Sequence, residues 1–158
     1  MIYLLLDNIR SVHNVGSIFR TAETLGVSRI YCTGTTPTPI DRFGRKRSDL
    51  AKVSLGAEDM VAWEHVESEK AAGLVENLQK ERFKAIALEQ AKGSVDYKKV
   101  KVKVKGKVLV ILGNEVDGVS KELLGLADTI AEIPMRGKKE SLNVSVAAGI
   151  FLYRFLDN

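Results

Sequence analysis

Three short polar segments interrupt the apolar pattern of this chain and carry the residues that could do chemistry. The first spans residues 13–22 and reads His-Asn-Val-Gly-Ser-Ile-Phe-Arg-Thr-Ala. Asn14 and Arg20 are six residues apart, so both can lie near the opening turns of one predicted helix but not on one identical face. Arg20 stands between Phe19 and Ala22, which leaves it little room as a casual surface residue. A solvated arginine is the ordinary alternative.

The second segment, residues 112–118, reads Leu-Gly-Asn-Glu-Val-Asp-Gly and directly follows the apolar run Val108–Leu112. Ligands of open α/β sheets bind at the carboxyl ends of strands, so Glu115 is well placed to face one. Gly113 would let a ligand approach the backbone closely. The glycine spacing matches neither a Walker loop nor a dinucleotide fingerprint. A plain turn is the alternative interpretation.

The third segment, residues 133–145, runs from a predicted strand end at Pro134 to the start of the last predicted helix. Ser141 and Asn143 open that helix, where both residue types serve as ordinary caps. Serine-hydrolase chemistry is disfavoured because the chain has no Gly-x-Ser-x-Gly elbow, and His13 and His65 have no evident aspartate orienter.

Alternating strands and helices must position these segments. Short apolar runs predict strands at Ile2–Leu6, Arg29–Cys32, Val61–Val66, Phe83–Leu88, Val108–Leu112 and Thr129–Ile133. Helical spacing predicts helices at residues 15–25 with Asn14 as the N-cap, around 49–55, at 69–82, after Ser120, and from about 143 to 155. This order predicts an α/β fold with a largely parallel sheet, in one domain over residues 1–158.

Two basic segments fall between these elements. Residues 42–47 read Arg-Phe-Gly-Arg-Lys-Arg, and Lys98–Lys107 alternates lysine with valine. The alternating segment is either an edge strand blunted by lysine or an extended basic arm. For each segment alone, a solvated charged face is the ordinary interpretation.

The last predicted helix is apolar around nearly its whole circumference, from Val144 to Leu156. Such a helix must be buried on more than one side. One interpretation is a two-fold dimer in which a second subunit covers one face. The other is a helix threaded through the core of its own subunit.

Composition excludes several classes of protein. The 158 residues are 45% hydrophobic and 28% charged, as in globular domains, which excludes disordered and collagen-like chains. One cysteine, Cys32, forms no internal disulfide and fits a reducing, cytoplasmic setting, and two histidines make a zinc site improbable. The longest apolar stretch is too short for a membrane span and contains Arg154, and no targeting segment is visible. The net charge of +4 permits a polyanionic partner.

Taken in order, the three polar segments resemble the motifs of the SpoU (TrmH-type) RNA 2′-O-ribose methyltransferases of the SPOUT superfamily. The matching positions are Asn14, Gly16, Arg20 and Ala22 in the first motif, Leu112-Gly113-Asn114-Glu115 with Gly118 in the second, and Ile133-Pro134-Met135 with residues 141–147 in the third. The resemblance covers almost the whole chain. It implies an α/β-knot fold with a C-terminal deep trefoil knot, and a homodimer through the last helix.

The resemblance also implies the cofactor and the site. S-adenosyl-L-methionine would lie near Leu88, Gly113, Ile133 and Leu142, with Ser141 beside it. Arg20, Glu115 and Asn143 would surround the reacting ribose, with Asn14 supporting Arg20. A guanidinium is a poor base near neutrality, so we expect Arg20 to stabilise the developing 2′-alkoxide and the adjacent phosphate.

The implied partner is RNA, and tRNA is slightly favoured over rRNA because compact family members without extensions often act on tRNA. The sequence begins at the first predicted strand, so we expect no N-terminal RNA-binding domain. RNA contacts are then expected from the two basic segments. Aromatics for base stacking are scarce beyond Phe43, Tyr97 and Trp63, and Trp63 is expected in the core instead. Two alternatives stay open: a non-catalytic RNA-binding module that kept the fold, and a SPOUT methyltransferase acting on a base nitrogen.

Overall fold

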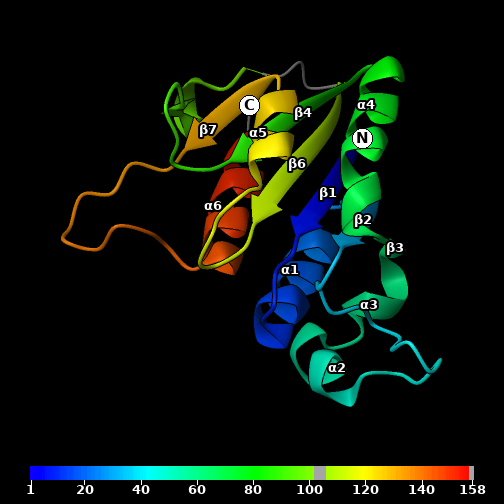
Figure 1. Cartoon of the computed structure of the whole chain (residues 1–158). Helices are drawn as coiled ribbons and strands as arrows, with labels where there is room; N and C mark the ends of the chain where they lie inside the picture. Colours follow the sequence, from blue (N-terminus) through cyan, green and yellow to red (C-terminus); the bar gives the residue numbers. More distant parts are fainter. Residues whose placement is uncertain (102–105, 157–158) are drawn as a thin grey trace.

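The strands form one parallel sheet. The computed structural model describes residues 1–101 and 106–156. Over these residues the sheet order is β3-β2-β1-β6-β4-β7-β5, and every pairing is parallel (Figure 1). The strands are β1 (Ile2–Asp7), β2 (Arg29–Thr33), β3 (Ala62–Val66), β4 (Phe83–Leu88), β5 (Val95–Asp96), β6 (Lys107–Gly113) and β7 (Thr129–Glu132). The predicted α/β class with a parallel sheet is confirmed.

Helices cover both faces of this sheet. They are α1 (Val12–Thr24), α2 (Ser48–Ser54), α3 (Ala57–Met60), α4 (Ala71–Lys80), α5 (Lys121–Leu126) and α6 (Val144–Leu156), with single 3₁₀ turns η1 (Ser68–Lys70) and η2 (Tyr97–Lys99). Helices α1 and α6 lie on one face and α4 and α5 on the other, because each pair packs against a different set of sheet side chains (Figure 1).

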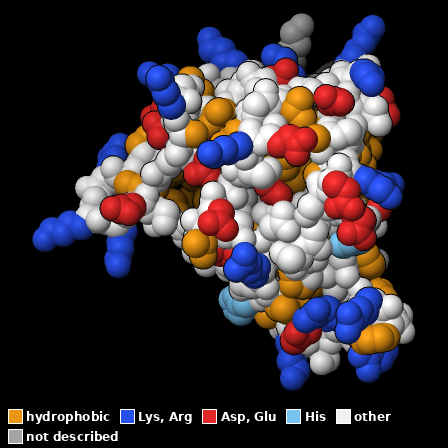
Figure 2. All heavy atoms as spheres, in the orientation of Figure 1, with side chains coloured by type: hydrophobic (Ala, Val, Ile, Leu, Met, Phe, Trp, Pro, Cys, Tyr) orange, Lys and Arg blue, Asp and Glu red, His pale blue; other side chains and the backbone are white. Residues whose placement is uncertain are grey.

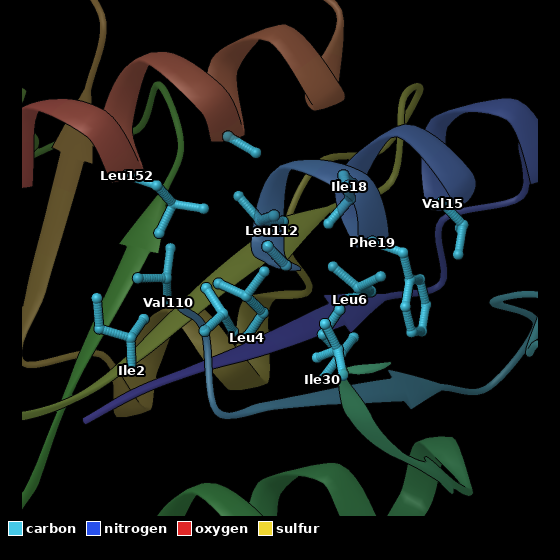
Figure 3. Close-up of a cluster of buried hydrophobic side chains, with 14 of the residues drawn as sticks. Ile2, Leu4, Leu6, Val15, Ile18, Phe19, Ile30, Val110, Leu112 and Leu152 are labelled. Atoms are coloured by element: carbon cyan, nitrogen blue, oxygen red, sulfur yellow. The ribbon is translucent and has the colours of Figure 1, made fainter. Parts of the chain in front are cut away.

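The sheet separates two hydrophobic clusters. Along β1, Leu4 and Leu6 point to the α1–α6 side, whereas Leu5 points to the α4–α5 side. The same alternation places Val110 and Leu112 of β6 in the first cluster (Figure 3). Strand β6 is buried on both faces, as its continuous apolar run predicts for a central strand.

The strand register brings the carboxyl ends of the central strands to one level. Asp7 pairs with Gly113, and Leu88 lies between Leu112 of β6 and Ala131 of β7. The strand order reverses beside β1, since β2 and β3 extend to one side and the later strands to the other. Such a reversal is where open α/β sheets leave a crevice for ligands.

The start of α1 differs from the predicted one. Ser11 is the N-cap, and its hydroxyl accepts a hydrogen bond from the backbone N–H of Asn14 at 3.1 Å. Asn14 therefore lies inside the first turn rather than at the cap. Serine and asparagine cap helices equally well, so their types alone could not decide between them. The consequence is that the Asn14 side chain is released for contacts outside its own helix.

Other differences concern short elements and the basic segment before β6. Helix α3 and strand β5 were not predicted, because pieces this short carry no readable periodicity. The helix predicted over residues 69–82 is η1 followed by the shorter α4. In the Lys98–Lys107 segment, Lys98 and Lys99 belong to η2 and Lys107 begins β6, while residues 102–105 lie outside the described residues.

Helix α6 packs only one of its faces within this chain. Ala148, Phe151 and Leu152 are buried in the first cluster, whereas Val146, Ile150 and Tyr153 stay exposed. The interpretation that this helix is threaded through the core of its own subunit is therefore wrong for the described residues.

Three observations concern membrane insertion, metal binding and cysteine chemistry. In the described part of the chain, no helix is long and apolar enough to cross a membrane. The same residues hold no group of three metal-ligating side chains. Burial raises the pKa of the Cys32 thiol to about 12, which keeps this thiol protonated and unreactive.

Candidate functional site

A cleft of about 490 Å³ opens at the carboxyl ends of β4, β6 and β7. The ends of these strands, the loop after β6, the loop after β7 and the start of α6 form its walls. Its lining includes seven of the residues singled out from the sequence: Leu88, Gly113, Glu115, Ile133, Ser141, Leu142 and Asn143. The fold thus brings the second and third polar segments together, although they are far apart in the sequence.

Local sequence explains how the third segment reaches the cleft. Pro134 cannot continue the hydrogen-bond ladder after β7, so the chain leaves the sheet there. It returns at Asn143, which caps α6: its Oδ1 accepts hydrogen bonds from the Ser145 backbone N–H at 2.9 Å and the Ser145 hydroxyl at 2.6 Å. The cap fixes the Asn143 side chain at the cleft wall.

The first segment joins the other two through a hydrogen-bonded chain of side chains. Asn14 Nδ2 donates to Glu115 Oε1 at 2.8 Å, and Asn143 Nδ2 donates to Asn14 Oδ1 at 3.0 Å. Asn14 is buried, and its amide supplies one donor and one acceptor to the two partners. Each of the three motifs therefore contributes one member. The expected support of Arg20 by Asn14 is not a hydrogen bond in this structure.

Glu115 is held as a carboxylate. Partial burial opposes its ionisation, but hydrogen bonds from the Asn14 side chain and from backbone N–H groups, those of Arg10 and Ser11 among them, outweigh that effect and lower its pKa. The Arg10 N–H lies 3.4 Å from Glu115 Oε2. Glu115 is consequently ionised at neutral pH.

Local packing gives a further reason for a glycine at position 113, beside the close approach of a ligand expected from the sequence. A Cβ at Gly113 would overlap the backbone of Gly118 and Val119, which fold back over it. The glycine therefore permits this tight turn, and it also lines the cleft. Two backbone bonds between Asn114 and Gly118, at 3.0 and 3.1 Å, close the turn.

Two acidic residues that the sequence analysis did not single out fix the far end of this turn. Glu89, just after β4, accepts the Val119 N–H at 3.0 Å, and Asp7 at the end of β1 accepts the Ser120 N–H at 2.8 Å. The sequence did offer a signal for both residues, because each follows an apolar run that was predicted to be a strand. Both carboxylates anchor the turn of the second motif to the carboxyl ends of β1 and β4.

Arg20 lies apart from the cleft lining. It is exposed on α1, while Phe19 and Ala22 point into the first hydrophobic cluster. The inference that Arg20 has little room at the surface was therefore wrong. Gly16 of the same motif has a packing role, because a Cβ there would crowd Val53 at 2.8 Å where α2 crosses α1.

The cleft is acidic within a basic protein. Glu89, Glu115 and Glu132 line it, and no lysine or arginine is among its described lining residues. Basic side chains lie outside it, on the loop that precedes α2 and on the loop between β7 and α6 (Figure 2). Of the three aromatics considered for base stacking, Trp63 and Tyr97 pack against the first cluster and Phe43 is exposed.

A wholly parallel sheet with a polar cleft at its carboxyl edge defines a ligand-binding α/β protein. Residues 1–153 match the model of the SpoU rRNA Methylase family, and the chain belongs to that family. This confirms the resemblance drawn from the three motifs.

The chain is also similar to individual proteins. It is 33% identical over 150 residues to the 23S rRNA (guanosine-2′-O-)-methyltransferase RlmB of Xylella fastidiosa (strain 9a5c), covering 95% of this chain and 56% of that protein. It is 35% identical over 147 residues to the tRNA (guanosine(18)-2′-O)-methyltransferase of Aquifex aeolicus (strain VF5), covering 93% and 64%. The chain thus spans less than two thirds of the length of these relatives.

A solved structure has the same fold. The AdoMet-bound rRNA methyltransferase from Sinorhizobium meliloti superposes with a TM-score of 0.85 at 29% identity, covering 97% of this chain and 54% of that one.

Proposed function

We propose that this protein transfers a methyl group from S-adenosyl-L-methionine to a ribose 2′-hydroxyl of RNA. The observation that carries the proposal is the Asn143–Asn14–Glu115 chain, because it joins all three family motifs at the wall of one cleft. Similar proteins named as rRNA and tRNA 2′-O-methyltransferases support it.

The cleft fits the cofactor in size and in charge. Its volume of about 490 Å³ lies within the range of small-molecule sites. S-adenosylmethionine carries a sulfonium and an ammonium against a single carboxylate, so it is a net cation. A lining with three glutamates and no described lysine or arginine suits such a ligand.

Leu88, Ile133 and Leu142 would hold the adenine ring in an apolar slot, with Gly113 and Ser141 at its polar edges. When bound, the cofactor supplies an activated methyl group on sulfur. The residues around it must orient the ribose and exclude water, since positioning alone contributes a large part of the barrier reduction in such transfers.

Glu115 and Asn143 are proposed to orient the ribose, with Asn14 fixing both side chains. Arg20 is proposed to stabilise the developing 2′-alkoxide and the neighbouring phosphate through its permanent charge. Because Arg20 is exposed and outside the lining, the RNA must extend from the cleft onto α1, or a second copy of the chain must present this arginine.

Four finer expectations belong to the same proposal. The C-terminal segment is proposed to form a deep trefoil knot, supported by membership of the family. A homodimer through α6 is supported by the exposed apolar residues Val146, Ile150 and Tyr153. The substrate is proposed to be tRNA rather than rRNA, and the site of action the cytoplasm.

Calorimetric titration of S-adenosylmethionine tests the cofactor site. We expect one molecule to bind per chain, and Leu142→Lys to weaken binding by about tenfold or more because it adds a cation to the acidic cleft. Leu142 is already 39% exposed, so this change leaves the core intact. The matched control is Leu55→Lys, an exposed leucine just after α2. Failure of the wild type to bind the cofactor and its demethylated product would contradict the proposal.

A further inference from the structure

The loop between β2 and α2, residues 39–47, presents an aromatic ring to solvent. Phe43 is 65% exposed at its tip. Arg42 precedes it and Arg45 lies two residues after it, and their guanidinium carbons lie 4.8 and 5.0 Å from the ring centroid. An exposed ring flanked by two guanidinium groups contributes nothing to the core, and the cofactor cleft does not contain it.

The loop is built as a rigid turn. One carboxylate oxygen of Asp41 accepts the Phe43 N–H at 2.8 Å and the Arg45 N–H at 2.9 Å. The Asp41 N–H donates to the Arg45 carbonyl and the Gly44 N–H donates to the Asp41 carbonyl, each at 2.9 Å. Gly44 supplies the positive φ of +77° that the turn requires. A further bridge pairs Ile40 with Lys46. The backbone that carries the ring is therefore held in place before any partner binds.

Some basic side chains of this loop form ion pairs that hold the loop in place, whereas the charge that is not neutralised in this way lies beside the ring. Lys46 Nζ contacts Asp59 at 2.6 Å and Glu58 at 3.5 Å, which fastens the base of the loop to α3. Arg47 is paired with Asp49 at 3.1 Å. Within the described residues Arg42 has no ion pair, and Arg45 shares the Asp41 carboxylate that holds the turn. The uncompensated charge is thus beside the ring.

We propose that Phe43, with Arg42 and Arg45, is a stacking site for an unpaired base of the RNA substrate, outside the cofactor cleft. This inference rests on the proposed function for the nature of the partner. Arginine–aromatic contacts at exposed sites are weak, so an incoming base displaces a guanidinium from the ring. The displaced arginine then binds the flanking phosphate in a two-pronged contact. Every base has a π-face, so the site recognises single-stranded RNA rather than a particular sequence.

The test measures RNA binding by fluorescence anisotropy, with labelled single-stranded oligoadenylate and a labelled RNA duplex of equal length as probes. The wild type is expected to prefer the single strand. Phe43→Leu and Phe43→Ala should each weaken single-strand binding by about 5- to 100-fold, the range that one base–aromatic stack contributes. Phe43→Trp should retain binding, and Arg42→Ala should weaken it and reduce its salt dependence. The matched control, Leu55→Ala, removes an exposed apolar side chain just after α2 and should change nothing.

The leucine variant separates stacking from apolar docking. Wild-type affinity in Phe43→Leu would overturn the proposal, because it would show that any apolar side chain serves, as in a protein-binding surface. Equal binding of duplex and single strand, or binding of neither, would overturn it as well. Calorimetry of S-adenosylmethionine with the wild type, run in parallel, tests the proposed function separately, so that the failure of either is recognised.

Discussion

Asn14 is the residue on which the candidate site depends most, because its one amide group supplies both a donor and an acceptor to the other two motifs. It donates to Glu115 and accepts from Asn143, so neither an acid nor an apolar residue can replace it. The ionised Glu115 that results has a folded-state pKa below its unfolded value. Its stabilising contribution is present above the unfolded pKa and is lost as the pH falls through the folded one.

Asn14→Asp is therefore expected to destabilise the protein at neutral pH. It removes the donor to Glu115 and places a second carboxylate beside the first, which raises the pKa of the pair. A carboxyl pKa that is raised in the folded state destabilises the protein when the pH lies above that pKa. This penalty disappears as the pH falls towards the pKa of the unfolded chain, which is near 4. Urea denaturation should show a loss of about 1–3 kcal/mol near neutrality and a smaller loss near pH 5. A variant as stable as the wild type near neutrality would contradict the assigned hydrogen bonds, and Asn14→Ala controls for loss of the bonds without the added charge.

Arg20→Ala is expected to lower the rate of methyl transfer by about 10²–10³, the cost of losing one preorganised charge donor. Cofactor affinity should barely change, because Arg20 is not among the cleft-lining residues. Arg20→Lys should restore the rate only in part, since an ammonium lacks the two-pronged contact with phosphate. Single-turnover methylation separates transfer from binding. Transfer by Arg20→Ala at the wild-type rate would return Arg20 to the role of a solvated surface residue.

At the scale of elements, the turn after β6 depends on a glycine that packs against backbone. Gly113→Ala should lower the free energy of unfolding by about 1–3 kcal/mol, because its Cβ would overlap Gly118 and Val119, which cannot move without breaking the turn. The matched control is Gly125→Ala in α5, where a Cβ meets nothing within 4 Å. This control should raise stability by about 0.5–1 kcal/mol, the helix preference for alanine. Equal stability of Gly113→Ala and the wild type, measured by thermal unfolding, would show that the turn tolerates a side chain.

Sequence patterns predicted the elements that bury long apolar runs, whereas most residues of the cleft lining were expected from the resemblance of the three motifs. The run Val108–Leu112 was predicted to be a central strand, and the loop at its carboxyl end holds Gly113 and Glu115. The partners of Asn14 could not be predicted, because they lie 101 and 129 residues further along the chain. The exposure of Arg20 was missed for a different reason: helical spacing shows which residues share a face of α1, but not how far along that face the burial extends.

At the scale of the whole molecule, α6 leaves an apolar face uncovered, and a second copy of the chain is proposed to cover it. Ile150→Glu should yield a folded monomer, because Ile150 is 36% exposed in the single chain. Phe151 is only 2% exposed, so Phe151→Glu should unfold the protein instead of probing the interface. Sedimentation velocity distinguishes the two outcomes. A monomeric wild type at micromolar concentration would contradict the dimer.

The distribution of charge suits a protein that binds a cation and a polyanion together. The acidic cleft faces the proposed cofactor, while the overall charge of +4 comes from basic residues outside that cleft. Because the negative potential of the cleft and the positive potential of the surrounding surface are separated, the first can attract the cofactor and the second the RNA. Binding of RNA should therefore weaken steeply with salt, as counterion release requires.

The central claim is methyl transfer to a ribose 2′-hydroxyl, and analysis of the product nucleosides tests it most directly. The purified protein is incubated with S-adenosylmethionine carrying an isotopically labelled methyl group and with RNA from cells that lack the protein. The RNA is then digested completely and its nucleosides are identified by mass spectrometry. We predict label in a 2′-O-methylnucleoside, and its loss with Arg20→Ala. Label confined to a methylated base, or no label in RNA that the protein binds together with the cofactor, would contradict the account.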